Sequence, residues 1–272
     1  MGDLKNDGYL SPDIINWIKK HRTENEALFL LSEEINKFAQ EQMLKLDMHS
    51  KDYQELLVAG GFVRALSSFQ GVVLMLERGM IFEAGTLFRA QIEAMLVVAA
   101  AAKERKFAHQ YILSDGVDRL HLMKNLLNSS GEITEIVKES FSWEDVESFK
   151  KQLKTDNINN ILIKEIAQVA GYPNWYNAVY AYFSQIAAHP TPSSLGIYFY
   201  APDGENIKEF CWGPDVCGIG ATLSSAIECL VVVLNEVSNL FKKDWTGILD
   251  SIHARIKQLT KPEDDDFGYK KT

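Results

Sequence analysis

The segment MIFEAGTLFRAQIEAMLVVAAAAK, residues Met80–Lys103, predicts the helix around which the rest of the chain folds. It has no consistently polar side, and a helix that is apolar all round is normally buried. It nevertheless carries Arg89 and Glu93 one turn apart, so both side chains face the same way. Because buried charges need partners, we expect this pair to point into the protein and to meet a second polar segment.

Two interpretations of Arg89 and Glu93 are open at this stage. Buried charged pairs can fix the register of packed helices, which is a purely structural role. Ionisable groups in apolar surroundings also gather at functional sites, which makes the pair a candidate site. An exposed surface pair is disfavoured by the apolar surroundings, and Arg preceding Glu is in any case the weaker order on a helix.

The partner segment is predicted at YFSQIAAHP, residues 182–190, in an aromatic helix that Pro173 opens. This helix must end near His189, because a residue before proline avoids the helical conformation. At such an end His189 can line a cavity and act as a general acid or base, or it can simply bond a backbone group. Ser184 falls on the opposite side of an ideal helix from His189, so a couple between them requires the helix to end early. The candidate catalytic residues are Arg89, Glu93, Ser184 and His189.

The fold class follows from the helical periods on both sides of the central segment. Residues 52–78 predict a helix joined to it by a short link, hence an antiparallel hairpin, with a close contact or kink at Gly60–Gly61. Residues 107–127 predict another helix, interrupted near Ser114–Gly116, and residues 214–241 a long buried one. Residues 196–212 contain the convincing β-hairpin, and Pro190–Pro192 predicts an extended segment before it. We expect an all-α bundle with one β-hairpin insertion: N-terminal helices over 1–48, the bundle over 49–260 and an acidic tail over 261–272.

Charge and composition narrow the function. The net charge of −9 and the isoelectric point of about 5.2 argue against a broad basic face for duplex DNA or anionic membrane, but leave room for a small positive pocket. Three cysteines are an odd count that suits the reducing cytoplasm, and the first residues lack the pattern of a signal peptide. The apolar runs at 94–102 and 219–234 are expected to be core helices and not membrane spans.

Motifs for cofactors and metals are absent from the sequence. Cys211 and Cys217 have five residues between them and no second pair follows, which differs from the usual zinc spacing. There is no phosphate-binding P-loop, dinucleotide fingerprint or nucleophile elbow. We therefore expect neither metal nor cofactor. The aromatic run over residues 175–183 could stack bases, but such a stripe is more often core.

The segments LFRAQIEA, residues 87–94, and YFSQIAAHPT, residues 182–191, resemble the two signature segments of an uncharacterised bacterial family, domain of unknown function 5677. Its pattern is Arg-x-x-x-Glu in one helix and Ser-x-x-x-x-His in another, and the resemblance covers about residues 50–240. Its helical layout is similar to HEPN domains, several of which are metal-independent ribonucleases in toxin and phage-defence systems. Those enzymes have four to six residues between an Arg and a following His, a spacing that this chain lacks; Arg105 and His109, with three residues between them, come nearest.

Two functions are consistent with these residues. In the first, a pocket of a cytoplasmic protein uses Arg89 to bind an anionic group such as a phosphate, Glu93 to orient Arg89 or His189, and His189 as the general acid or base. The resemblance implies that this pocket belongs to a metal-independent ribonuclease or toxin of a bacterial defence system. The alternative is a non-enzymatic helical interaction protein in which the same residues form a structural cluster. The expected partners are RNA or another phosphate-bearing ligand, or a second copy of the chain.

Overall fold

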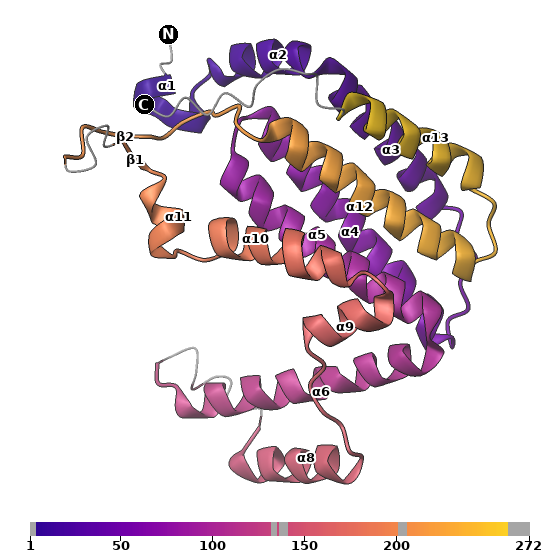
Figure 1. Ribbon diagram of the computed structural model, residues 1–272. Coiled ribbons are helices and arrows are strands. Elements are labelled where there is room, and N and C mark those ends of the chain that lie inside the picture. The colour runs from indigo at the N-terminus through magenta and orange to yellow at the C-terminus, as the bar shows by residue number, and fades with distance from the viewer. Residues whose placement is uncertain (1–3, 132–134, 136–140, 201–205, 261–272) are drawn as a thin grey trace.

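The computed structural model describes residues 4–131, 135, 141–200 and 206–260. These residues are mostly helical, with one small two-stranded antiparallel sheet, so the predicted fold class is confirmed (Figure 1). The predicted acidic tail, 261–272, lies outside the described residues.

The N-terminal half is built from helices: α1 (Leu4–Asp7), η1 (Gly8–Leu10), α2 (Ile14–Glu24), α3 (Glu26–Met43), α4 (Tyr53–Glu77), α5 (Ile81–Lys103) and α6 (Arg105–Asn128). The C-terminal half contains α8 (Trp143–Thr155), α9 (Ile163–Ala170), η2 (Trp175–Tyr180), α10 (Ala181–Phe183), η3 (Ser184–Ala188), α11 (Pro192–Gly196), β1 (Phe199–Tyr200), β2 (Glu209–Phe210), α12 (Ile219–Leu240) and α13 (Thr246–Leu259).

Helix α5 lies in the middle of the bundle and packs against α4, α12, α9 and the η2–η3 segment (Figure 1). Every residue from Ala94 to Ala101 is buried, as expected for a helix without a polar side. The largest fully buried side chains of the core are phenylalanines of α3, α4 and α5 itself: Phe29, Phe62, Phe69 and Phe88. The predicted central helix is therefore confirmed.

Helices α4 and α5 form the predicted antiparallel hairpin. Asp52 caps α4 by accepting hydrogen bonds from the backbone N–H groups of Gln54 and Glu55. The turn passes through Gly79, whose φ of +69° favours glycine. A Cβ on Gly61 would lie only 2.6 Å from Cγ2 of Val98, so this glycine permits the close contact between the two helices that the sequence predicts.

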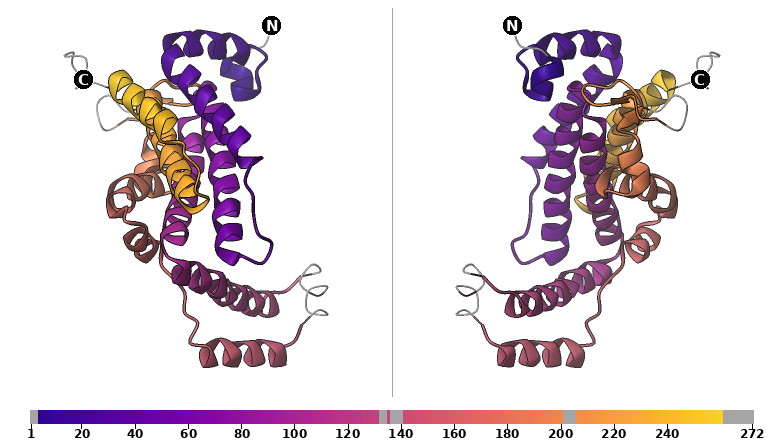
Figure 2. Two further views of the ribbon diagram at one scale, coloured as in Figure 1. Left: turned by 90° about the vertical axis from the view of Figure 1, so that its right-hand side faces the viewer. Right: turned by 90° about the vertical axis from the view of Figure 1, so that its left-hand side faces the viewer.

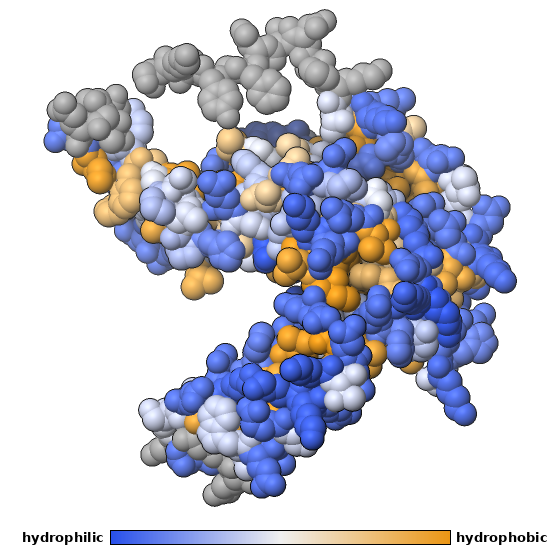
Figure 3. Space-filling view, turned by 60° about the horizontal axis from the view of Figure 1, so that its bottom comes forward, coloured by the Kyte–Doolittle hydropathy of each residue, from blue (hydrophilic) through white to orange (hydrophobic). Residues whose placement is uncertain are grey.

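Helices α6 and α8 form an arm that projects from the bundle (Figures 1 and 2), and the space-filling view shows the surface hollowed between this arm and the rest of the molecule (Figure 3). It has its own small core, in which Leu120, Val146 and Leu153 are buried. The predicted interruption at Ser114–Gly116 is wrong, because α6 continues through it. Gly116 instead lets α8 approach closely: a Cβ there would lie 2.9 Å from Cδ2 of Leu153.

The aromatic helix takes an unusual form. Residues 175–180 and 184–188 are π-helical turns with one α-helical turn between them, and the segment ends at His189 as predicted. The extended segment predicted over Pro190–Pro192 is wrong at its end, since α11 begins at Pro192 with Thr191 as its cap. Helix α12 begins at Ile219, later than the predicted residue 214, behind the positive-φ cap Gly218.

By length and composition alone, three helices within the described ranges could cross a membrane: α4, α5 and α12. In the structure they pack against one another around the common core. The predictions of a cytoplasmic protein without a membrane remain predictions.

The two adjacent glycines of α4 provide a test of this packing. Gly60→Ala should stabilise the protein by roughly 0.5–1 kcal/mol, because its Cβ meets nothing within 4 Å and alanine favours the helix. Gly61→Ala should destabilise it by about 1–3 kcal/mol, because its Cβ would overlap the buried, β-branched Val98. Urea unfolding of the two variants measures both changes; the same sign for both would contradict the observed α4–α5 contact.

Candidate functional site

Four polar side chains meet where the η2–η3 segment crosses α5, and we call them the polar cluster: Arg89, Glu93, Tyr180 and Ser184. Arg89 donates from Nε to Ser184 Oγ over 2.9 Å and from Nη2 to the Tyr180 hydroxyl over 2.6 Å. Its Nη2 also lies 2.9 Å from Oε1 of Glu93. The Tyr180 hydroxyl donates to the same Glu93 oxygen over 2.8 Å. The predicted partner segment of Arg89 is therefore the one observed.

Small residues on α5 bring this segment close enough. A Cβ on Gly85 would lie 2.8 Å from Cδ1 of Phe183 and 2.9 Å from Cβ of Ala187, so only glycine permits the approach. One residue on, Thr86 Oγ1 donates to the backbone carbonyl of Ala187 over 3.1 Å. Phe183 also packs edge to face on Phe88, with ring centroids 5.1 Å apart. These contacts place Tyr180 and Ser184 over Arg89.

The polar cluster sits at the edge of the bundle and not inside it. The side chains of Arg89 and Glu93 are 25% and 37% exposed, so the expectation that both point into the interior is wrong. The reason is that residues 175–188 cover this side of α5 incompletely. The pKa of Tyr180 is raised by partial burial and by the Glu93 carboxylate, against the opposing effect of Arg89. The guanidinium of Arg89 also lies 4.8 Å from the centre of the Tyr180 ring.

Ser184 joins Arg89, whereas His189 does not join the polar cluster. His189 is exposed, and within the described residues its ring makes no hydrogen bond or ion pair. Its backbone carbonyl accepts from the Ser194 hydroxyl over 2.8 Å. Among the four predicted site residues, the structure thus brings together Arg89, Glu93 and Ser184.

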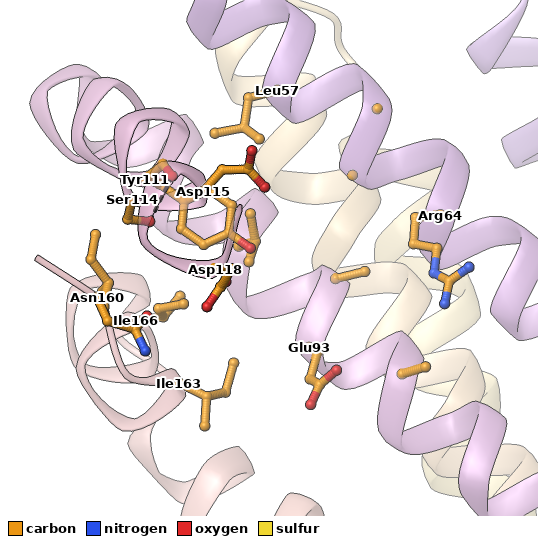
Figure 4. A pocket seen from close by; sticks show the side chains of 16 residues that line it. Leu57, Arg64, Glu93, Tyr111, Ser114, Asp115, Asp118, Asn160, Ile163 and Ile166 are labelled. Carbon is orange, nitrogen blue, oxygen red and sulfur yellow. Dashed lines mark hydrogen bonds between the residues drawn. The ribbon is translucent and has the colours of Figure 1, made fainter. Parts of the chain in front are cut away.

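A cavity of about 500 Å³ adjoins the polar cluster, and Figure 4 shows its lining. It lies between α4, α5, α6, α9 and the loop before α9, with Glu93 of the polar cluster in its wall. Its other polar lining residues are Arg64, Tyr111, Ser114, Asp115, Asp118 and Asn160. Its apolar lining includes Leu57, Val97, Ile161, Ile163 and Ile166.

Charged groups in this cavity lack protein partners. Arg64, Asp115 and Asp118 are exposed toward solvent, and none forms an ion pair or hydrogen bond within the part of the chain that the structure describes. The pKa of Tyr111 is raised by burial first, and then by the carboxylates of Glu93, Asp118 and Asp115. Figure 4 shows the Tyr111 side chain beside Asp115 and Asp118.

Sequence reasoning overlooked Tyr180 and the cavity. Tyr180 belongs to an aromatic run that we interpret as core, yet its hydroxyl is the signal that one end of the side chain needs a polar partner. The cavity residues come from α4, α5, α6, α9 and the loop before α9, and no spacing rule joins them. The clearest available signal is Arg64, the single charged residue of α4 between Glu55 and Glu77.

The cysteines and acidic groups offer no evident metal centre. Cys211 and Cys217 are exposed and Cys229 is buried, and all three are free thiols; burial raises the pKa of Cys229. Within the described ranges, no group of three His, Cys, Asp or Glu side chains is arranged to hold a metal ion.

Comparison with known proteins gives one match. A family described as "Family of unknown function (DUF5677)" matches residues 55–206, which span just over half of the chain and contain the whole polar cluster. No curated protein and no solved structure matches.

The polar cluster should hold the η2–η3 segment on α5. Tyr180→Phe should cost about 1 kcal/mol of unfolding free energy, and Arg89→Ala about 1–3 kcal/mol because it leaves Glu93 without its cation. Partial exposure of the pair favours the lower end of that range. Urea unfolding measures both changes. The control is Arg119→Ala on α6, since Arg119 is exposed and has no ion-pair or hydrogen-bond partner among the described residues. An Arg89→Ala variant as stable as this control would show that the cluster does not fasten the segment.

The raised pKa of Tyr180 predicts a loss of stability in alkali. A folded-state pKa above the unfolded value of about 10 means that the folded protein holds the phenolic proton more tightly. This contribution is complete below pH of about 10 and is lost as the pH rises through the folded pKa. Tyr9, with its pKa raised to about 12 by burial and Glu83, acts in the same direction. Melting temperatures between about pH 9 and 11.5 should fall less steeply in Tyr180→Phe than in the wild type; equal slopes would contradict this assignment.

Proposed function

Because the chain belongs to DUF5677, a family of unknown function, we propose its function from its own geometry. It is a non-enzymatic helical protein that binds a small polar ligand in the cavity between α4, α5, α6 and α9. The polar cluster is the structural support of that cavity, because Glu93 belongs to both.

The observation that carries this proposal is the unpaired charge in the cavity. Arg64, Asp115 and Asp118 line one space of about 500 Å³ without partners in the described part of the protein. Small-molecule sites are typically hollows of about 300–1,000 Å³ with an apolar lining and a few convergent polar groups. The cavity fits this description, since isoleucines and a leucine surround its charges.

The contacts of Arg89 favour a supporting role for the polar cluster. Its Nε and Nη2 are already bonded to Ser184, Tyr180 and Glu93, and its charge is balanced by the Glu93 carboxylate. A guanidinium that is held in this way fixes the register of two packed segments. His189, the residue expected to move protons, lies outside the cluster and is exposed.

A second candidate function is metal-independent RNA cleavage in a bacterial defence or toxin role. The observation that favours it is the convergence of Arg89, Ser184 and Tyr180 at a half-exposed position on two distant segments, with His189 five residues beyond Ser184. In this version Arg89 binds the phosphate that the neighbouring 2′-hydroxyl attacks, and the bond from phosphorus to the 5′-oxygen breaks. His189 takes the proton of the attacking hydroxyl or gives one to the leaving 5′-oxygen.

A second copy of the chain is the partner that we propose for the exposed hairpin. Exposed apolar side chains gather on and beside it: Tyr182, Leu195, Ile197, Phe199, Tyr200, Ile207, Phe210, Trp212 and Val216. The sheet has only two strands within the described residues, so each strand has a free edge. Two copies around a two-fold axis would pair these strand edges and bury the apolar side chains of one copy against those of the other.

Blocking the cavity tests the main proposal. Gly60 lines it, and a Cβ there meets nothing within 4 Å, so Gly60→Trp should fill the space without disturbing the helix. A panel of small amines, amino acids, sugars and nucleotides should contain compounds that raise the melting temperature of the wild type but not of Gly60→Trp. The matched control is Gly247→Trp on α13, which is equally unobstructed and lies away from the cavity. Binding that survives Gly60→Trp, or a panel without any binder, would overturn the proposal.

The two candidate functions differ in an assay with RNA in a chelator. We expect the purified wild type to leave RNA intact, because the cluster is structural. If the wild type degrades RNA, and Arg89→Ala and His189→Ala abolish this while their circular dichroism is unchanged, the ribonuclease function replaces the binding function. Toxicity of the wild type but not of His189→Ala in cells would support the same conclusion.

A further inference from the structure

The charges of the cavity are arranged by sign. Asp115 and Asp118 of α6 lie on one side of the cavity, and Arg64 of α4 lies on the other. Glu93 of α5 lies between the two aspartates and Arg64 (Figure 4). Figure 4 also shows Tyr111 beside the two aspartates. A ligand that satisfies these groups must carry positive charge at its α6 end and negative charge at its α4 end.

The charge balance of the site sets the net charge of the ligand. Glu93 is already paired with Arg89 at 2.9 Å, so the uncompensated groups are two carboxylates and one guanidinium. Within the described residues these three groups carry a net charge of −1, which a ligand with two cationic groups and one carboxylate balances. A nucleotide or another polyanion would instead bring its charge against Asp115 and Asp118.

The uncharged lining fits an alkyl chain between these ends. Leu57, Ile163 and Ile166 provide apolar surface in the cavity. The ring of Tyr111, which stacks on Phe107 at 5.8 Å, offers an aromatic group beside the aspartates, as in many sites for organic cations. A basic amino acid has both features, a methylene chain and a cationic end.

We propose that the cavity binds a basic amino acid, or a molecule with the same charges, with its guanidinium or ammonium tail at Asp115 and Asp118. This inference rests on the proposed function and adds the class of ligand. Arg64 binds the carboxylate of the ligand, for which a guanidinium has the matching two-pronged geometry. The amino group of the ligand lies toward Glu93.

Titration calorimetry with three probes tests the charge pattern. L-Arginine should bind, and L-citrulline, which has nearly the same shape but an uncharged tail, should bind about tenfold more weakly, since one charge-assisted hydrogen bond is lost. Agmatine, which is arginine without its carboxylate, should bind to the wild type and to Arg64→Gln with equal affinity. L-Glutamate should not bind.

Variants assign each end of the ligand. Asp118→Asn should weaken L-arginine and agmatine alike by about five- to tenfold, whereas Arg64→Gln should weaken L-arginine only. All substituted side chains are exposed, so the fold should be retained, which circular dichroism checks. The charge-matched controls are Asp250→Asn on α13 and Arg119→Gln on the solvent side of α6; neither lines the cavity.

The outcomes separate the two levels of the proposal. If L-citrulline equals L-arginine, if L-glutamate binds better, or if Asp250→Asn weakens binding as much as Asp118→Asn, the ligand class is wrong. Other compounds of the panel that bind the wild type but not Gly60→Trp would then still support the proposal that the cavity binds a ligand. If magnesium or calcium ions bind instead and Asp118→Asn removes them, the site is a metal site and the inference also falls. If no probe or panel compound binds, both proposals fail.

Discussion

The constraint on which the structure depends is that α5, which has no consistently polar side, must be packed against other elements while its few charges still find partners. α4 and α12 cover two sides and the segment from α9 to η3 covers a third. That segment supplies a tyrosine to the middle of α5 and another to its C-terminal end: Tyr180 meets Arg89 and Glu93, and Tyr172 meets Lys103 and Glu236. At the second position Lys103 Nζ lies 3.0 Å from buried Glu236, and burial and Glu236 raise the pKa of Tyr172. Each junction thus joins a cation, a carboxylate and a phenol.

These two junctions determine where the cavity forms. A carboxylate left alone in apolar surroundings is costly, so Glu93 and Glu236 favour only the packing in which their partners are in place. That packing fixes α9, which carries Ile163 and Ile166, against the side of α5 that carries Glu93. The space between α9, α6 and α4 is therefore defined by polar contacts beside it and not by contacts within it. This explains why its own charged residues remain available to a ligand.

The elements that could be predicted from sequence are those with a strong local signal. Apolar periodicity predicts α4 and α5, proline predicts the end of the aromatic helix at His189, and the position of Arg89 predicts its meeting with the 182–190 segment. The geometry of the π-helical turns, by contrast, has no rule that a single sequence reveals, so the role of Tyr180 was missed. The residues near Gly116 predict a helix break that does not form, because the role of the glycine is in tertiary packing: it leaves room for the side chain of Leu153. The cavity joins residues of four elements, and only the folded chain brings them together.

The electrostatics of the assembled site separate its two candidate functions more sharply than the sequence can. Phosphodiester cleavage requires uncompensated positive charge where the phosphate binds. Arg89 stands beside Glu93, and the neighbouring cavity adds Asp115 and Asp118 against a single Arg64, so a polyanion approaching Arg89 from that side meets an excess of carboxylates. The net charge of −9 on the whole chain acts in the same direction. For RNA to bind there, Glu93 would have to release Arg89, and the Tyr180 hydroxyl would lose its acceptor. A small cation needs no such rearrangement, because Asp115 and Asp118, its acceptors, have no partner within the described residues.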